Sequence, residues 1–242
     1  MKRLVLTLLG LMIVSLGIGL IISPADLRGF SISSASHTVD VRKSQSLSGI
    51  ATVSLETTSH DIHVSRGSGD ALEAHLFGTV GGSNTDDPLS LQQDGDILHI
   101  SESKQPHLGF AIFGIGTRSA VLEVTLPKSY TGNLEVSTVS GDLTLTGPGT
   151  PLTATSVSGD LSLTLDSLVG PMKTTTVSGD VQLNLPADSS FSTDFSTVSG
   201  DVRNDFTGDS SISHGRYHAS VGGGSQNITI NTTSGDLRIS KR

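Results

Sequence analysis

A tripeptide repeat constrains the fold of this 242-residue chain more than any other feature of its sequence. In the second half of the chain Ser-Gly-Asp occurs five times, at residues 140–142, 158–160, 178–180, 199–201 and 234–236, and a degenerate copy of this repeat occupies residues 58–62. The steps between successive aspartates of the five copies are 18, 20, 21 and 35 residues. A unit of about 20 residues cannot bury an apolar face by itself, so equivalent strands of successive units must stack on one another.

Apolar residues keep fixed offsets from each repeat glycine. Leucine or valine stands two residues after it, and in most copies an apolar residue also stands four residues after it and seven residues before it. This alternation is typical of a β-strand. In four copies, a valine two residues before the glycine is out of phase with the strand that precedes it. We therefore expect each repeat to contain two short strands joined by a kink at the Ser/Thr pair.

These patterns predict an all-β fold, a β-solenoid of the single-stranded, right-handed β-helix type with coils of about 20 residues. Identical residues at identical offsets favour parallel stacking of successive coils, because only that arrangement gives each copy the same environment. An antiparallel β-sandwich is the alternative. The first half is less regular: Asp94-Gly95 predicts a hairpin, and residues 122–126 alternate as a strand up to Pro127. We expect irregular early coils or a capping β-sheet in this half.

The first 23 residues predict a membrane anchor. Lys2 and Arg3 precede the apolar run Leu4–Ile22, which only one threonine and one serine interrupt and which as a helix would span about 28 Å. A signal peptide cleaved after residues 23–25 is the alternative. In either case the basic residues hold the N-terminus in the cytoplasm and the remainder is exported. Residues 24–47 predict a Ser-rich spacer, part of which could already be a strand, and residues 48–242 the β-repeat domain.

The repeats resemble those of the bacterial putative-adhesin domain family, whose members include LiaG-like envelope proteins. The resemblance rests on the Val-Ser-Gly-Asp-(Leu/Val) motifs, on Leu-x-Val-x-Leu-Pro at residues 122–127 and on the Gly-rich segment 221–224. It covers roughly residues 48 to 242. It implies an exported, non-enzymatic β-repeat domain of the cell envelope, and it carries no functional residues over to this chain.

The repeat corners are the first candidate site. Stacked coils would bring Asp142, Asp160, Asp180 and Asp201 into a row with spacings of about 4.8 Å. We expect turn chemistry, in which glycine supplies conformational freedom and aspartate accepts backbone N–H groups. A calcium ladder is the alternative, although calcium needs roughly six to eight oxygens and each repeat has a single aspartate. The corner residues are Gly141, Asp142, Gly159, Asp160, Gly179, Asp180, Gly200, Asp201, Gly235 and Asp236.

The sequence predicts no metal, cofactor or catalytic site. His60 and His63 would face opposite sides of a strand, and His214 and His218 lie in a segment rich in glycine and serine. The chain has no cysteine, no tryptophan and two tyrosines, so thiolate sites are excluded and the aromatic platform of a sugar-binding cleft is missing. We expect a non-enzymatic protein; a polysaccharide-active enzyme on a β-helix is a distant alternative. The net charge of −8 argues against binding nucleic acid.

One apolar segment remains, residues 109–116, which contains Phe110, Ile112, Phe113 and Ile115. It predicts either a cover over an open end of the solenoid or a contact with the membrane or a membrane partner. The whole sequence therefore predicts a single-pass protein of the cell membrane with an extracytoplasmic, adhesin-like or stress-accessory binding role. A regulatory partner of a membrane sensor is the alternative. The expected partner is an envelope or membrane protein, and no particular small-molecule ligand is indicated.

Overall fold

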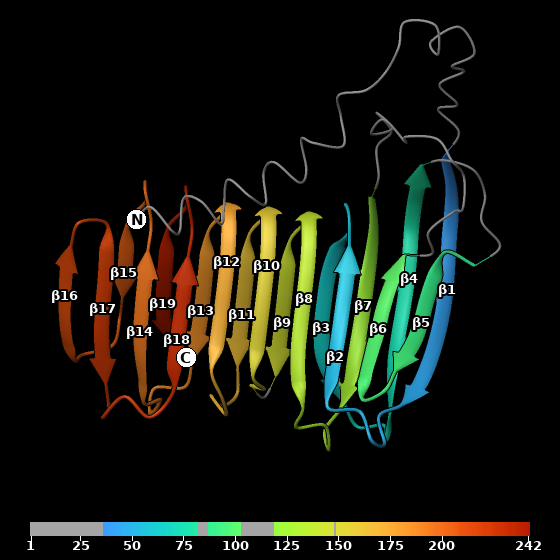
Figure 1. Cartoon of the computed structure of the whole chain (residues 1–242), viewed down its shortest axis with the longest axis horizontal. Coiled ribbons are helices and arrows are strands. Elements are labelled where there is room, and N and C mark those ends of the chain that lie inside the picture. Colours follow the sequence, from blue (N-terminus) through green and yellow to red (C-terminus); the bar gives the residue numbers. More distant parts are fainter. Residues whose placement is uncertain (1–35, 82–86, 103–118, 148) are drawn as a thin grey trace, which may run out of the picture.

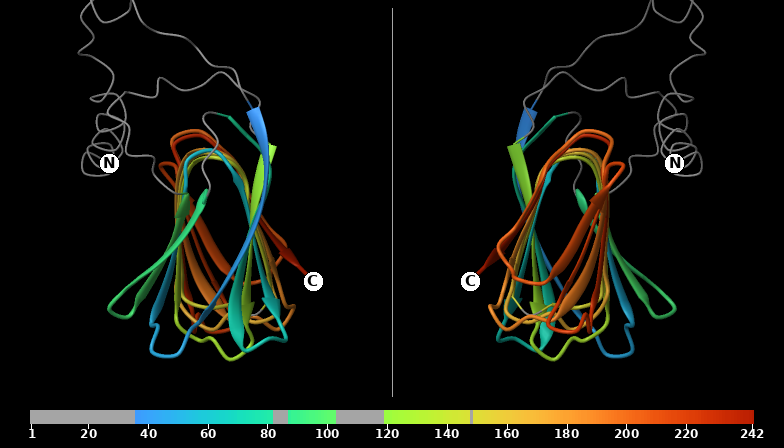
Figure 2. Two further views of the ribbon diagram at one scale, coloured as in Figure 1. Left: turned by 90° about the vertical axis from the view of Figure 1, so that its right-hand side faces the viewer. Right: turned by 90° about the vertical axis from the view of Figure 1, so that its left-hand side faces the viewer.

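The computed structural model describes residues 36–81, 87–102, 119–147 and 149–242, which form two large β-sheets. The sheets face each other along the long axis of the molecule (Figure 1). Viewed along that axis, they form two walls that meet in arches along one edge (Figure 2). The described residues contain strands and no helix, so the predicted all-β class is confirmed for this part of the chain.

The nine-stranded sheet contains one strand of each repeat. In spatial order its strands are β1 (Ser36–Ser46), β4 (Ala71–Gly81), β7 (Ser119–Pro127), β3 (Asp61–Gly67), β9 (Leu143–Gly147), β11 (Leu161–Leu165), β13 (Val181–Leu185), β19 (Leu237–Lys241) and β15 (Val202–Asn204).

The ten-stranded sheet contains the other strand of each repeat. In spatial order its strands are β16 (Asp209–Ser213), β17 (Arg216–Val221), β14 (Phe191–Ser196), β18 (Asn227–Asn231), β12 (Met172–Ser178), β10 (Leu152–Ser158), β8 (Asn133–Ser140), β2 (Thr52–Thr57), β6 (Ile97–Glu102) and β5 (Leu89–Asp94).

Each repeat forms one coil, which we define as a strand of the ten-stranded sheet followed by a strand of the nine-stranded sheet. Equivalent strands of neighbouring coils pair in parallel and in register, so that Leu152 lies opposite both Leu134 and Met172. Among the described strands, antiparallel pairs occur toward the two ends of the stack, at β1, β4 and β5 and at β16 and β17. The repeats therefore stack in parallel, as their shared offsets predict, and not as an antiparallel sandwich.

The coils do not stack in the order of the sequence. From one end to the other the order is β6/β7, β2/β3, β8/β9, β10/β11, β12/β13, β18/β19 and β14/β15. The expectation that successive repeats are neighbours is therefore wrong at both ends. At the C-terminal end, the 35-residue step between Asp201 and Asp236 contains the strands β16 and β17, which occupy the outer side of β14. The last coil consequently pairs on the inner side of β14 and β15.

The predicted kink before each corner is also wrong. The strands keep their alternation, and the buried positions lie seven, five and three residues before the glycine, as Leu134, Val136 and Thr138 lie before Gly141. The position three residues before the glycine holds serine or threonine, so an apolar pattern does not reveal that this position is buried. The valine next to it faces outward; Val198, for example, is 73% exposed.

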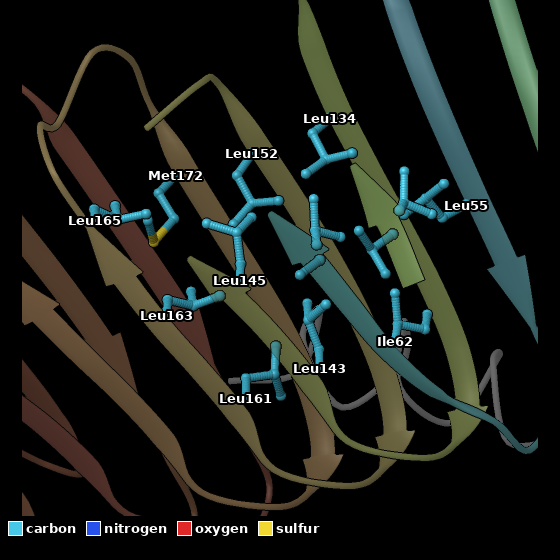
Figure 3. Packing of buried hydrophobic residues seen from close by; sticks show 14 of the residues in the cluster. Leu55, Ile62, Leu134, Leu143, Leu145, Leu152, Leu161, Leu163, Leu165 and Met172 are labelled. Atoms are coloured by element: carbon cyan, nitrogen blue, oxygen red, sulfur yellow. The ribbon is translucent and has the colours of Figure 1, made fainter. Parts of the chain in front are cut away.

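The core consists of apolar ladders that run along the stack. Leucines and isoleucines of both sheets point between the walls in Figure 3, where Ile62, Leu143 and Leu161 follow one another on β3, β9 and β11. All three are almost completely buried. Burying such a side chain contributes roughly 1.5–3 kcal/mol, so the regular ladders supply most of the hydrophobic stabilisation of a chain that is poor in aromatic residues.

The first half is more regular than its sequence predicts. The degenerate repeat forms the coil β2/β3, with Val53 opposite Leu134 and Ile62 opposite Leu143, as its offsets predict. The predicted hairpin at Asp94-Gly95 is confirmed as β5 and β6. β1 pairs with β4 over its whole length, so the sheet begins at residue 36, inside the segment predicted as a spacer.

The predicted membrane anchor, residues 1–23, lies outside the described residues. Within the part of the chain that the structure describes, no helix is long and apolar enough to span a membrane.

Candidate functional site

The Ser-Gly-Asp corners line the arched edge of the stack, where each coil passes from one sheet to the other (Figure 2). Their glycines have positive φ angles, +135° at Gly159 and +143° at Gly179. A Cβ atom on Gly179 would lie 2.1 Å from the carbonyl oxygen of Gly159, and one on Gly159 would lie 2.2 Å from that of Gly141. Both the backbone conformation and the close approach of the next coil therefore require glycine.

The corner aspartates form a continuous hydrogen-bonded row. Oδ1 of each aspartate accepts a hydrogen bond from the backbone N–H of the aspartate in the next coil, at 2.7–2.9 Å. The row contains, in spatial order, Asp61, Asp142, Asp160, Asp180, Asp236 and Asp201. It includes Asp61 of the degenerate repeat, and it places Asp236 between two aspartates that the sequence order would make neighbours. One carboxylate oxygen of every rung but the last is thus engaged in joining the coils.

A shallow groove runs beside this row on the outer side of the nine-stranded sheet. It has a volume of about 330 Å³ and lies between Asp180, Asp236 and Asp201 on one side and Gln182, Arg238 and Arg203 on the other. Arg238 and Arg203 lie directly opposite each other on β19 and β15. Among the described residues, no group of three or more histidine, aspartate or glutamate side chains is arranged to hold a metal ion.

The histidines are dispersed. His60 is buried at the first corner with its Nδ1 atom 2.6 Å from Oε1 of Glu102, whereas His63 faces outward on β3. His214 and His218 belong to the two-stranded antiparallel segment β16–β17 and not to an irregular loop. Nδ1 of His218 lies 2.9 Å from Oδ1 of Asp194 on the neighbouring strand. The two contacts join neighbouring elements: His218 on β17 contacts Asp194 on β14, and His60 at the first corner contacts Glu102 at the end of β6.

The outer faces of both sheets include straight rows of small polar side chains. On the ten-stranded sheet, Ser137, Thr155, Thr175, Asn231 and Ser196 lie opposite one another on five consecutive strands. Neighbouring strands of a sheet are about 4.8 Å apart. The described chain thus presents regular arrays of hydroxyl and amide groups beside the charged, shallow groove.

A buried polar cluster closes the opposite edge of the stack. The Arg66 guanidinium donates to the backbone oxygens of Pro127, Lys128 and Tyr130, and the Tyr130 hydroxyl donates to the Asn133 oxygen at 2.7 Å. Burial raises the pKa of Tyr130 to about 12 and lowers that of Arg66. Because every partner of the guanidinium is a backbone oxygen, this cluster holds the turn after β7.

The structure places only part of the predicted site residues. The ten corner residues lie along the arched edge, joined by the row of hydrogen bonds. Phe110, Ile112, Phe113 and Ile115 lie outside the described residues. Sequence reasoning missed the free edge of β15, because that edge arises from the order of the coils.

Comparison with known families decides the classification. The model of the family described as "Toastrack DUF4097" matches residues 50–153 and again residues 146–240. The chain belongs to the Toastrack DUF4097 family. The two matches, which overlap at residues 146–153, together cover nearly all of the coils that the structure describes, which agrees with a chain built by repetition. No curated protein matches the chain.

Solved structures agree with the fold. A crystal structure from Clostridium sporogenes, described as "a putative cell adhesion protein", has a TM-score of 0.59 at 12% identity and covers 85% of this chain and 100% of its own. "A putative adhesin" from Bacteroides fragilis has a TM-score of 0.30 at 12% identity and covers 87% and 100%. A "Putative lipid binding protein" from Parabacteroides distasonis has a TM-score of 0.27 at 11% identity and covers 84% and 96%. Only the Clostridium structure is similar enough to support a shared fold.

Proposed function

We propose that the chain is a non-enzymatic binding protein of the cell envelope, adhesin-like or stress-accessory in role. In this proposal residues 1–23 anchor it in the membrane with the N-terminus in the cytoplasm. The β-repeat domain, a solenoid of the right-handed, single-stranded type, lies outside the cell. The observation that carries the binding role is the pair of outer faces, on which rows of polar side chains repeat at the spacing of the strands.

Three further observations support this proposal. The corner carboxylates are engaged in joining coils, which leaves them poorly placed for general acid–base chemistry. The family match indicates no enzyme. The Clostridium structure that shares the fold is described as a cell adhesion protein. A regular array of hydroxyl groups on a rigid surface suits the recognition of an extended, polar envelope component.

Co-sedimentation with envelope fragments tests the binding role. We expect the purified chain to pellet with the fragments, and a double substitution on one face to release it. The two matched pairs are Thr155→Glu with Thr175→Glu on the ten-stranded sheet and Ser162→Glu with Thr164→Glu on the nine-stranded sheet. Failure of the wild-type chain to pellet would contradict the proposal, as would retention of both double variants.

The second candidate function is a regulatory partner of a membrane sensor. The apolar segment with Phe110 and Phe113 is the sequence feature that favours it. Crosslinking in native membranes, followed by purification of the intact chain and of a chain without residues 1–23, separates the two candidates. A regulatory partner predicts one membrane protein that is captured only with the anchored chain. An adhesin-like role predicts envelope material captured with both.

A further inference from the structure

The C-terminal end of the stack is a step. The nine-stranded sheet ends at β15, whereas the ten-stranded sheet continues for two more strands, β17 and β16, beyond the strand of the same coil. In Figure 1 these two strands project past β15 at the end of the molecule. Among the described strands, none of the nine-stranded sheet therefore lies opposite the inner face of β16 and β17.

β15 has a free hydrogen-bonding edge. Its one partner strand in the described structure is β19, with Arg203 opposite Arg238. The Leu237 N–H donates to the Asp201 oxygen, and the Asp205 N–H donates to the Ile239 oxygen, so the backbone groups of odd-numbered residues face β19. In a parallel ladder the intervening residues direct their N–H and C=O groups to the other side. The backbone groups of Val202 and Asn204 consequently point away from the sheet.

An apolar hollow lies directly inside this edge. Phe195, Tyr217, Ile212 and Val202 contribute to the lining of a hollow of about 110 Å³. Ile212 lies opposite the buried Tyr217 and shares its inward face, yet 76% of its surface is exposed. An added strand beside β15 would cover this isoleucine.

The polar groups of the edge define the chemistry of such a strand. Asp201 is the last rung of the corner row: its N–H donates to Asp236, but its own carboxylate accepts no hydrogen bond within the described residues. Arg203 faces outward with its side chain 68% exposed; its Nε atom lies 3.3 Å from Oδ1 of Asp205, and it stands opposite Arg238. The row thus ends in an unfilled acceptor next to two exposed guanidinium groups.

We propose that the β15 edge binds an extended strand of another protein, which adds to the nine-stranded sheet in parallel with β15. The strand donates a backbone N–H to Asp201, places apolar residues opposite Val202 and Asn204, and places an acidic residue opposite Arg203. Addition to a free sheet edge combines main-chain hydrogen bonds with pockets for alternate side chains. The proposal rests on the proposed binding role, but not on the location of the protein.

The shape of the step favours a single strand or hairpin over a second copy of the chain. The opposite end of a second copy would bring β1 and β4 beyond β7 in one sheet and β5 beyond β6 in the other. If β1 of the second copy paired with β15 of the first, β4 and β5 of the second copy would both lie at the same position along the stack as β16 of the first copy. Because β16 already occupies that level in the ten-stranded sheet, the two strands would collide.

Fluorescence anisotropy with a labelled peptide tests the proposal on the full chain. The probe is the ten-residue segment 176–185 of this protein, whose Val-Ser-Gly-Asp corner matches the ladder, with Gln182 replaced by glutamate or by lysine. We expect the glutamate peptide to bind about fivefold more tightly than the lysine peptide, since cross-strand charge pairs contribute up to about 1 kcal/mol. Arg203→Glu should reverse that order, whereas Lys173→Glu, at an exposed position of β12 in the other sheet, should not.

Two further variants test the edge itself. Val202→Pro removes an N–H group that β19 does not use, and Ile212→Lys alters an exposed side chain; each should weaken peptide binding about tenfold or more while the melting curve stays cooperative. Val169→Lys, at another exposed apolar residue, is the matched control.

Absence of peptide binding by the folded wild-type chain would overturn the proposal, as would binding that Val202→Pro leaves unchanged. Concentration-dependent dimers that Val202→Pro abolishes would assign the edge to a second copy and also overturn it. A chain that pellets with envelope fragments but binds no peptide refutes this inference and leaves the proposed function standing.

Discussion

Replacing a corner glycine by alanine should be far more damaging than the size of a methyl group suggests. At Gly179, φ is +143° and the new Cβ would lie 2.1 Å from the Gly159 oxygen. An L-residue in such a conformation costs about 1–3 kcal/mol. The overlap with backbone must also push these two coils apart, which lengthens the hydrogen bond from the Gly159 N–H to the Ser178 oxygen and costs about 1 kcal/mol more. We expect Gly179→Ala to destabilise the domain by about 3 kcal/mol, or to lower Tm by about 6–12 °C for a domain of this size.

Two other glycines separate the contributions. Gly49 has a φ of +78° with open space around its Cβ position, and Gly69 has open space and no positive φ. Gly49→Ala should therefore show the conformational cost alone, about 1 kcal/mol, and Gly69→Ala should be close to neutral. Thermal melts of the three variants, followed by circular dichroism, give the comparison. If Gly179→Ala were no worse than Gly49→Ala, the close contact between coils would not exist and the reasoning would be refuted.

Three more predictions concern the core, the aspartate row and the buried tyrosine. Leu163→Asp should destabilise by several kcal/mol in urea melts because it buries an unpaired carboxylate, whereas Ser162→Asp on the outer face should change stability by no more than about 0.5 kcal/mol; equal effects would refute the assigned register. Asp180→Ala should cost about 1 kcal/mol of stability because the hydrogen bond from the Asp236 N–H is lost, whereas Asp180→Asn keeps the acceptor and should be neutral in thermal melts. If millimolar calcium raised the Tm of the wild type and not that of Asp180→Asn, the aspartate row would instead be a metal site. The folded pKa of Tyr130, about 12, exceeds its unfolded value of about 10, so stability is intact below pH 10 and should fall by about 2 kcal/mol as the pH rises to 12. Unfolding free energies of the wild type and Tyr130→Phe across this range provide the check, and a fall that persists in the variant would contradict the assignment.

The sequence predicts the register of the coils because buried and exposed residues alternate along each strand in the same way in every coil. A residue that must face the core in one coil must do so in the next, and parallel stacking brings equal offsets level with each other. For this reason Val53 and Leu134 could be placed opposite each other although they are 81 residues apart, through the degenerate copy of the repeat. The hairpin at Asp94-Gly95 follows in the same way from the conformational demand of a two-residue turn.

The order of the coils could not be predicted from the same pattern. The offsets from each repeat glycine determine which residues of two neighbouring coils lie opposite each other. Because every coil presents nearly the same edge, these offsets do not determine which two coils are neighbours. The long step before Asp236 was the one signal of an interruption in the series. The inward hydroxyl position, as at Thr138, was missed because threonine carries no apolar signature and the exposed Val139 beside it does.

The order of the last coils is the claim on which the free edge of β15 depends, and engineered disulfides test it most directly. The chain has no cysteine of its own, so any disulfide in a double variant is unambiguous. Gln182 lies opposite Arg238, which lies opposite Arg203; neighbouring strands are about 4.8 Å apart, within disulfide reach, whereas a separation of two strands is too far. After mild oxidation, we expect mass spectrometry to find the disulfide in the double variant Gln182→Cys with Arg238→Cys and not in the double variant Gln182→Cys with Arg203→Cys. The opposite result would mean that the coils stack in sequence order, that β15 is covered, and that the proposed strand-binding edge does not exist.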